Sequence, residues 1–122
     1  MTRRQRIEQI IIGSLLTDFP TYQQDAIGII TPDMFDDEAY QRAFALMEEQ
    51  HGGGQTPDLL TVCTRMMDDA YHLAEASIDG DFNTLKASYN IIQRVTGQGK
   101  LTNVTFEEYI TKFMELYEQD TH

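Results

Sequence analysis

Apolar residues recur at steps of three and four along most of the chain, which is the period of an α-helix. The clearest example spans residues 38–50, where one face is apolar and the opposite face is charged. Its apolar positions are Ala39, Tyr40, Ala43, Phe44 and Met47. Gly52 to Gly54 follow and are expected to end this helix. No segment of useful length shows the two-residue alternation of a half-buried strand, so the pattern predicts an all-α fold.

Two copies of one helix-start signal flank this central helix, Thr31-Pro32-Asp33 and Thr56-Pro57-Asp58. In each copy Thr can accept a backbone N–H, Pro suits the first helical position, and the helix dipole favours Asp. The first copy predicts a short turn that brings Met34 and Phe35 into the core. Asp36 or Asp37 is then expected to cap the central helix.

The second copy predicts a helix that begins at Thr56. Apolar residues wrap around much of its circumference, so we expect this helix to be deeply buried. These residues are Leu59, Leu60, Val62, Cys63, Met66 and Met67.

The N-terminal pattern predicts a helix over residues 3–16 and a break that contains Pro20. A second helix is expected from Thr21 to about Ile29, with Tyr22, Ala26 and Ile29 inward. Gly13 lies inside the first helix, where glycine costs about 1 kcal/mol relative to alanine. We therefore expect Gly13 to pack closely against a neighbouring element.

Beyond residue 68 the pattern predicts three further helices. The first spans residues 70–78, with Tyr71 and Ala74 inward, and ends at a break formed by Asp79-Gly80-Asp81. The next spans residues 82–95, and a polar loop over residues 96–103 follows. Thr105 and Glu108 form a capping-box pattern that starts the last helix, at about residues 106–119. Residues 1–122 are thus predicted to form a single domain, a compact orthogonal bundle of about six to eight helices.

The last helix carries an unusually wide apolar face, rich in aromatic residues, for a helix at the end of a chain. An apolar face of that width must be covered. It either contributes a partner surface or closes the core, and both alternatives stay open. The candidate interface residues are Phe106, Tyr109, Phe113 and Tyr117.

Composition narrows the classes of partner. Hydrophobic residues make up 41% of the chain, which is typical of a folded domain, and the net charge is −11. Six of the nine basic residues and all 20 acidic residues follow residue 6. An acidic body repels phosphate, so we expect no direct nucleic-acid binding, and the charge favours solubility or a basic protein partner.

A single cysteine, Cys63, fits a reducing compartment such as the cytoplasm, and no apolar run approaches the about 20 residues of a membrane span.

The motifs that could carry chemistry all fail on spacing. Gly97-Gln98-Gly99-Lys100-Leu101-Thr102 lacks the first glycine and the Ser or Thr of a phosphate-binding P-loop. The Asp79-Gly80-Asp81 string has no Glu at the twelfth position of a calcium loop. Histidines 51, 72 and 122 lie far apart, and His72 with Asp68 is the nearest candidate for a metal pair. We therefore expect no catalytic, cofactor or metal site.

An ordered set of short segments resembles the N-terminal domain of bacterial DnaB-type replicative helicases. The resemblance covers about residues 7–67 and is only loose over residues 68–122. The matching segments are Glu8-Gln9 with Ile12-Gly13-Ser14-Leu15-Leu16, Thr31-Pro32-Asp33-Met34-Phe35, the series Tyr40, Phe44 and Met47, Gly52 to Gly54, and Pro57-Asp58-Leu59-Leu60-Thr61-Val62.

In that family the domain forms a collar above the motor ring, pairs subunits and docks primase, whereas ATP chemistry belongs to a separate C-terminal motor domain. The resemblance therefore implies a non-catalytic interaction and oligomerisation domain, with a second copy as the expected partner and primase or other replisome proteins as further candidate partners. It would be part of an ATP-dependent DNA helicase if a motor domain follows in the natural protein. The alternative is a stand-alone acidic adaptor or regulator that binds a basic protein.

Overall fold

The computed structural model describes residues 1–68, 75–97 and 100–120, and these residues form helices without a β-strand. The described residues contain five α-helices, slightly fewer than the six to eight helices expected, and two short 3-10 helices. They are α1 (Arg3–Tyr22), η1 (Gln23–Asp25), η2 (Pro32–Met34), α2 (Glu38–Gly52), α3 (Leu59–Asp68), α4 (Glu75–Thr96) and α5 (Asn103–Asp120). The all-α prediction is confirmed.

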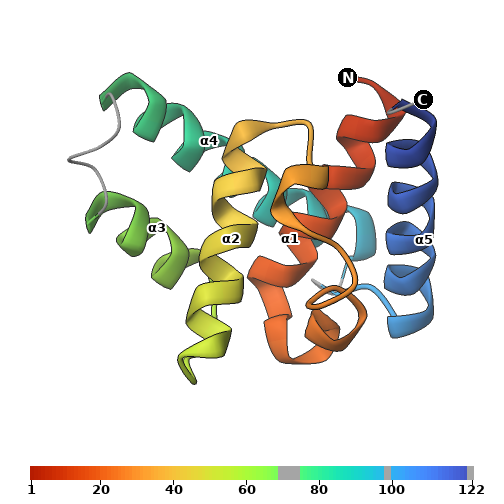
Figure 1. Cartoon of the computed structure of the whole chain (residues 1–122), viewed down its shortest axis with the longest axis horizontal. Coiled ribbons are helices and arrows are strands. Elements are labelled where there is room, and N and C mark those ends of the chain that lie inside the picture. The colour runs from red at the N-terminus through yellow and green to blue at the C-terminus, as the bar shows by residue number, and fades with distance from the viewer. Residues whose placement is uncertain (69–74, 98–99, 121–122) are drawn as a thin grey trace.

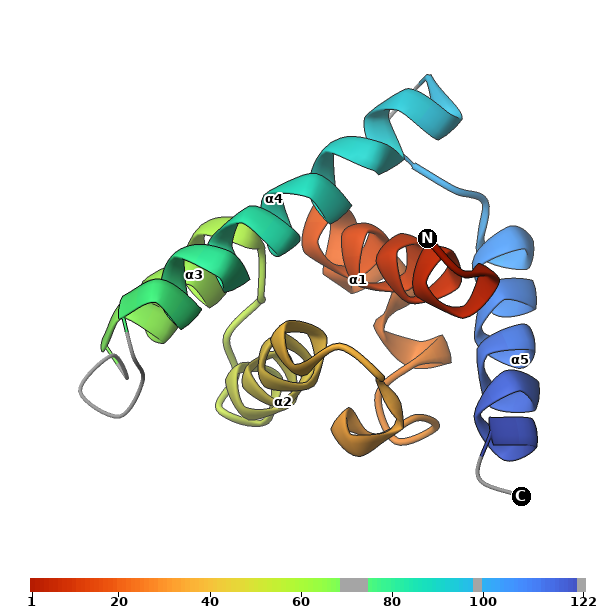
Figure 2. The same ribbon diagram turned by 90° about the horizontal axis from the view of Figure 1, so that it is seen from above.

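Helix α1 lies at the centre of the bundle. Helix α4 crosses it on one side, α5 covers another, and α2 lies nearby (Figures 1 and 2). Every residue from Ile7 to Leu16 is buried, which explains why this stretch is apolar around much of its circumference.

Helices α1 and α4 approach each other closely at Gly13. A Cβ at Gly13 would overlap the backbone carbonyl oxygen of Ser88 and lie 2.9 Å from Cγ1 of Ile92. The Tyr40 hydroxyl of α2 forms a 2.7 Å hydrogen bond with Ser88 Oγ, and burial raises the pKa of Tyr40 to about 12. Three helices therefore meet at this crossing, and the expectation that Gly13 packs closely is confirmed.

A buried carboxylate ties α1 to the start of α2. Glu8 Oε1 accepts the backbone N–H of Asp36 at 3.0 Å, and Glu8 Oε2 accepts Arg4 Nε at 3.1 Å. Arg4 also donates to Met34 O at 2.8 Å and to Asp120 Oδ2 at 2.7 Å, which brings the two ends of the chain together (Figure 1). Burial raises the pKa of Glu8 above its ordinary value, although the backbone N–H groups and Arg4 oppose that shift.

The first helix is longer than expected. It continues to Tyr22, but Asp18 has non-helical dihedral angles (φ −152°, ψ 71°) and kinks the helix two residues before Pro20. The expected break is therefore present as a kink, close to the expected helix end at residue 16, and not as a loop. Pro20 lies just after the kink, where its missing N–H falls in the first turn of the continuing segment. The helix expected from Thr21 to Ile29 is wrong, because α1 ends at Tyr22 and only the short η1 follows it. The Thr21 hydroxyl donates to Asp18 Oδ2 at 2.7 Å, and Ile29 is exposed, whereas Tyr22 and Ala26 are buried as expected.

The elements around α2 agree with the prediction. The expected short turn is η2, Phe35 is fully buried and Met34 is partly buried. Asp37 caps α2, since its carboxylate accepts the N–H of Ala39 at 2.8 Å. The apolar face expected for this helix is buried.

Helix α3 differs from the prediction in both start and burial. It begins at Leu59 rather than Thr56, because Asp58 and Thr61 form reciprocal bonds: Asp58 Oδ1 accepts Thr61 N at 2.8 Å and Asp58 N donates to Thr61 Oγ1 at 2.9 Å. Only Val62 and Met66 are buried, so deep burial of this helix was wrong. Leu60 and Met67 are 74% and 60% exposed.

The second half of the chain has one long helix where a break was expected. Asp79-Gly80-Asp81 lies inside α4, because buried Asp81 forms a two-pronged ion pair with Arg42 of α2, with both N–O distances 2.7 Å. Residues 69–74 lie outside the described residues, so the predicted helix over 70–78 is observed only in the backbone of its last part. Helix α5 begins at Asn103, and its cap is Thr102, whose Oγ1 accepts Thr105 N at 3.1 Å, rather than Thr105.

The Gly13 contact predicts the result of two alanine substitutions. Gly13→Ala is expected to lower the free energy of unfolding by about 3 kcal/mol, because rigid backbone at Ser88 blocks the new methyl group. Gly80→Ala is the matched control: Gly80 is also helical, has nothing within 4 Å of its Cβ position, and should gain about 0.5–1 kcal/mol. Urea unfolding followed by circular dichroism measures both, and equal effects would contradict the close crossing.

The buried Glu8 predicts a pH dependence of stability. Because its pKa is raised in the folded state, protonation favours folding, and this stabilisation is lost as the pH rises through the folded-state pKa. The unfolding free energy of the wild type minus that of Glu8→Gln should therefore increase as the pH is lowered from neutral to below 4.5, the ordinary pKa of a glutamate side chain. A difference that shrinks over the same range would show that the charged carboxylate is the preferred state.

Candidate protein-interaction surface

Helices α3 and α4 lie side by side as a hairpin that extends from the body of the bundle (Figure 2). Where this hairpin meets α1, the side chains leave a groove of about 540 Å³. We call it the α3–α4 groove; its lining is Leu16, Thr17, Asp58, Leu59, Leu60, Cys63, Lys86 and Tyr89. Its walls are thus drawn from three separate parts of the chain.

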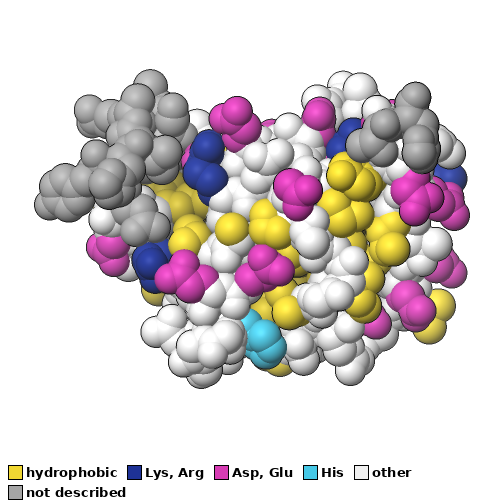
Figure 3. Space-filling view, in the orientation of Figure 1, with side chains coloured by type: hydrophobic (Ala, Val, Ile, Leu, Met, Phe, Trp, Pro, Cys, Tyr) yellow, Lys and Arg dark blue, Asp and Glu magenta, His cyan; other side chains and the backbone are white. Residues whose placement is uncertain are grey.

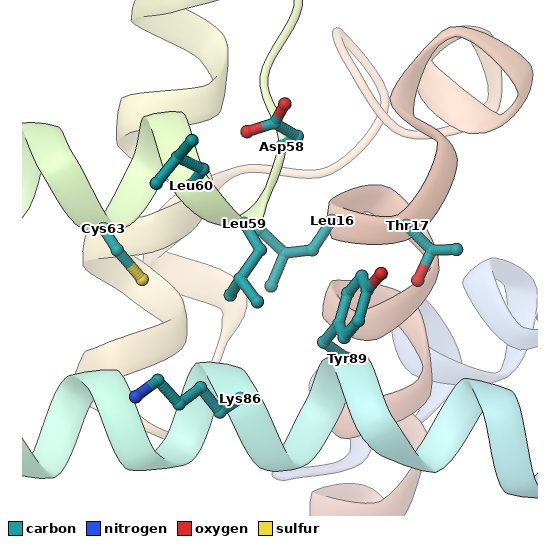
Figure 4. A pocket seen from close by; sticks show the side chains of 8 residues that line it. All are labelled: Leu16, Thr17, Asp58, Leu59, Leu60, Cys63, Lys86 and Tyr89. Atoms are coloured by element: carbon teal, nitrogen blue, oxygen red, sulfur yellow. The ribbon is translucent and has the colours of Figure 1, made fainter.

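Helical spacing explains how the walls form. Leu59 and Cys63 are four residues apart on α3 and point toward α4, while Tyr89 points from α4 toward Leu16 of α1 (Figure 4). Leu59, Cys63 and Tyr89 are partly buried at the margin of the core. The groove is therefore an apolar extension of the core that opens to solvent.

The charges on the groove are few and opposite in sign. Asp58 lies at the start of α3, and Lys86 extends along α4 below Cys63 (Figure 4). Burial raises the pKa of the Cys63 thiol, although Lys86 lowers it slightly. The thiol therefore stays protonated at neutral pH and has the character of an apolar wall rather than of a nucleophile.

A line of exposed side chains on α3 begins at Leu60, which lines the groove. It consists of Leu60, Thr64 and Met67, which follow the i, i+4, i+7 spacing of one helix face, and all three are exposed. Val62 and Met66 occupy the opposite, buried side. The wide distribution of apolar residues that suggested a deeply buried helix instead reflects two apolar faces, of which the fold buries only one.

The predicted interface on α5 is divided by the structure. Phe106 and Phe113 are fully buried, and their rings pack at a tilt against Tyr22 and Phe35 with centroids 4.6 and 4.8 Å apart. These two phenylalanines close the core, which was the alternative explanation, and offer no surface to a partner in this conformation. Tyr109 and Tyr117 are partly buried, so each still presents some surface to solvent.

The loop and histidine residues considered as phosphate or metal sites have ordinary structural contacts wherever the structure describes them. Lys100, of the glycine-containing loop, forms a 2.8 Å ion pair with Asp18, and Gln98 and Gly99 lie outside the described residues. The His51 ring packs against Phe19 with centroids 5.4 Å apart; His72 and His122 lie outside the described part of the chain. Within residues 1–68, 75–97 and 100–120, no three His, Cys, Asp or Glu side chains are grouped to hold a metal ion. No helix in those ranges combines the length and apolarity needed to cross a membrane.

Fold and surface together define a small all-α domain with a central buried helix and an apolar groove on a projecting hairpin. A family model described as "DnaB-like helicase N terminal domain" matches residues 1–78. This match spans more than half of the chain, and the chain belongs to that family. Searches of curated proteins and of solved structures gave no match.

The groove itself was not predicted from the sequence. Its walls come from α1, α3 and α4, and Leu16 and Tyr89 are 73 positions apart. The one available signal was the pair Leu60 and Met67, one heptad apart on a helix whose other face already supplied core residues.

The apolar face of α5, which is buried at Phe106 and Phe113 but partly exposed at Tyr109 and Tyr117, predicts opposite outcomes for two charge substitutions. Phe113→Glu should unfold the domain, because it places a carboxylate in the core and removes the contact with Phe35, at a cost of at least about 4 kcal/mol. Tyr117→Glu should keep the helical circular dichroism spectrum and lose no more than about 1.5 kcal/mol. Thermal unfolding measures both, and collapse of the Tyr117 variant would assign this position to the core as well.

Proposed function

We propose that this chain is a non-catalytic protein–protein interaction domain that self-associates as a dimer. Membership of the helicase N-terminal domain family supports an oligomerisation role. The observation that carries the proposal is the exposed apolar face of α3, since Leu60 and Met67 are largely exposed and Leu60 lines an apolar groove. Protein–protein surfaces have this composition, whereas enzyme sites require convergent polar groups.

A second partner is a further part of the proposal. In the DnaB-type family the domain docks primase, and the partly exposed Tyr109 and Tyr117 on α5 are the surface we assign to primase or another replisome protein. Tyrosine suits this role because it combines a large apolar area with a hydroxyl group. The family's role in replication also supports a location in the cytoplasm.

The alternative, an acidic adaptor for a basic protein, is favoured by the outer side of α5. A shallow surface there is lined by Val104, Glu107, Glu108, Thr111, Lys112 and Glu115, with three carboxylates and one ammonium group. Acidic side chains are also spread over the face of the molecule in Figure 3, with apolar side chains showing between them. An adaptor would need a cationic partner and would bind it mainly through charge.

Sedimentation equilibrium distinguishes the two functions. An oligomerisation domain should reach a mass of twice 14.0 kDa as its concentration is raised, with a dissociation constant in the micromolar range or tighter. Because apolar burial drives the association, raising the salt concentration from about 0.1 to about 1 M should change that constant less than about threefold.

A chain that remains at 14.0 kDa over the whole concentration range would contradict self-association. If the same chain bound a basic protein, and high salt abolished the binding, the adaptor function would replace the one proposed here.

A further inference from the structure

We propose that two copies of the chain pair through the α3–α4 groove about a two-fold axis, with Leu60 of each copy entering the groove of the other. The inference rests on the proposed self-association and assigns it a surface. It also places the subunit contact away from the aromatic residues of α5, which the sequence had offered as the candidate interface.

The first argument is that a projecting side chain, Leu60, lies next to the groove that could receive it. In a two-fold interface one patch must be complementary to itself, so each copy has to supply both. Leu60 is 74% exposed at the rim of the groove, and beside it Leu59, Cys63 and Tyr89 form apolar walls. The space of about 540 Å³ is ample for a leucine side chain.

The second argument is the outer face of α3. Leu60, Thr64 and Met67 have the spacing of a helix–helix seam, with a small residue at the middle position. A small side chain there allows two α3 helices to approach closely near the axis. Met67, 60% exposed, would lie at the end of this seam. Both large side chains lose most of their exposed area if α3 pairs with a second α3.

The third argument is charge. The chain has a net charge of −11, so two copies repel each other over most of their surfaces. The groove lining, by contrast, contains one carboxylate, Asp58, and one ammonium group, Lys86, and is neutral overall. Asp58 lies near the start of α3 and Lys86 on α4 (Figure 4), so a two-fold axis can place the acid of one copy opposite the base of the other. A strongly basic partner would find a better match on the outer side of α5.

The decisive comparison is between two exposed apolar positions. Leu60→Asp should keep the protein at 14.0 kDa at concentrations where the wild type is dimeric, a loss of affinity of at least a hundredfold. Val104→Asp is the matched control, because Val104 is 67% exposed on α5 and lies outside the groove lining. It should dimerise like the wild type. Both variants should retain the helical circular dichroism spectrum, since neither side chain is in the core.

Cross-linking tests the same arrangement of the two copies without removing an apolar side chain from the proposed contact. In a Cys63→Ser background, Thr64→Cys should form a disulfide-linked dimer under mild oxidation, because Thr64 lies at the centre of the proposed seam. Val104→Cys in the same background should remain monomeric on a non-reducing gel.

The outcomes separate this inference from the function on which it rests. A wild-type dimer that survives Leu60→Asp, or that cross-links through position 104 and not 64, overturns the groove interface while self-association stands. A wild-type chain that stays at 14.0 kDa overturns both, and leaves the groove to a helix of another protein.

Discussion

The contact between the α1 and α4 backbones at Gly13 and Ser88 is the constraint on which the remaining structure depends. No side chain separates the two helices at this point, since a single methyl group at Gly13 would overlap the Ser88 carbonyl. Ser88 also receives Tyr40 from α2, so the crossing fixes the position of a third helix. Helix α4 is thereby held against α1, and α3, which packs on α4, is held where the groove forms.

The rest of the core is organised around the ends of α1. At its start, Glu8 and Arg4 connect the beginning of α2 with the end of α5. At its other end the kink at Asp18 turns the chain toward the 100–103 loop, where Tyr22 donates to Leu101 O at 2.6 Å and Lys100 pairs with Asp18. Polar bonds thus fix both ends of a helix whose middle is almost entirely apolar. Helix α3 buries only Val62 and Met66, so its opposite face is free to present a surface.

Sequence reasoning succeeded where information is local. The period of apolar residues located α2 and most of α1, α4 and α5, and the Asp37 cap and the close packing at Gly13 followed from local rules. It failed where distant residues decide the outcome. Asp81 sits inside a helix because Arg42, 39 positions away, neutralises it, and no local pattern shows that pairing. Likewise, an amphipathic pattern gives the width of an apolar surface but not whether the chain itself or another molecule covers it. Phe106 and Phe113 were covered by the chain, and Leu60 was not.

The central claim, that α1 and α4 touch backbone to backbone and so position the hairpin with its groove, is tested most directly by nuclear Overhauser contacts in the wild-type protein. The account predicts strong contacts from the Gly13 α-protons to protons of Ser88 and Ile92, together with contacts between Tyr40 and Ser88. A well-dispersed spectrum of the folded chain that lacks the contacts from Gly13 would contradict it.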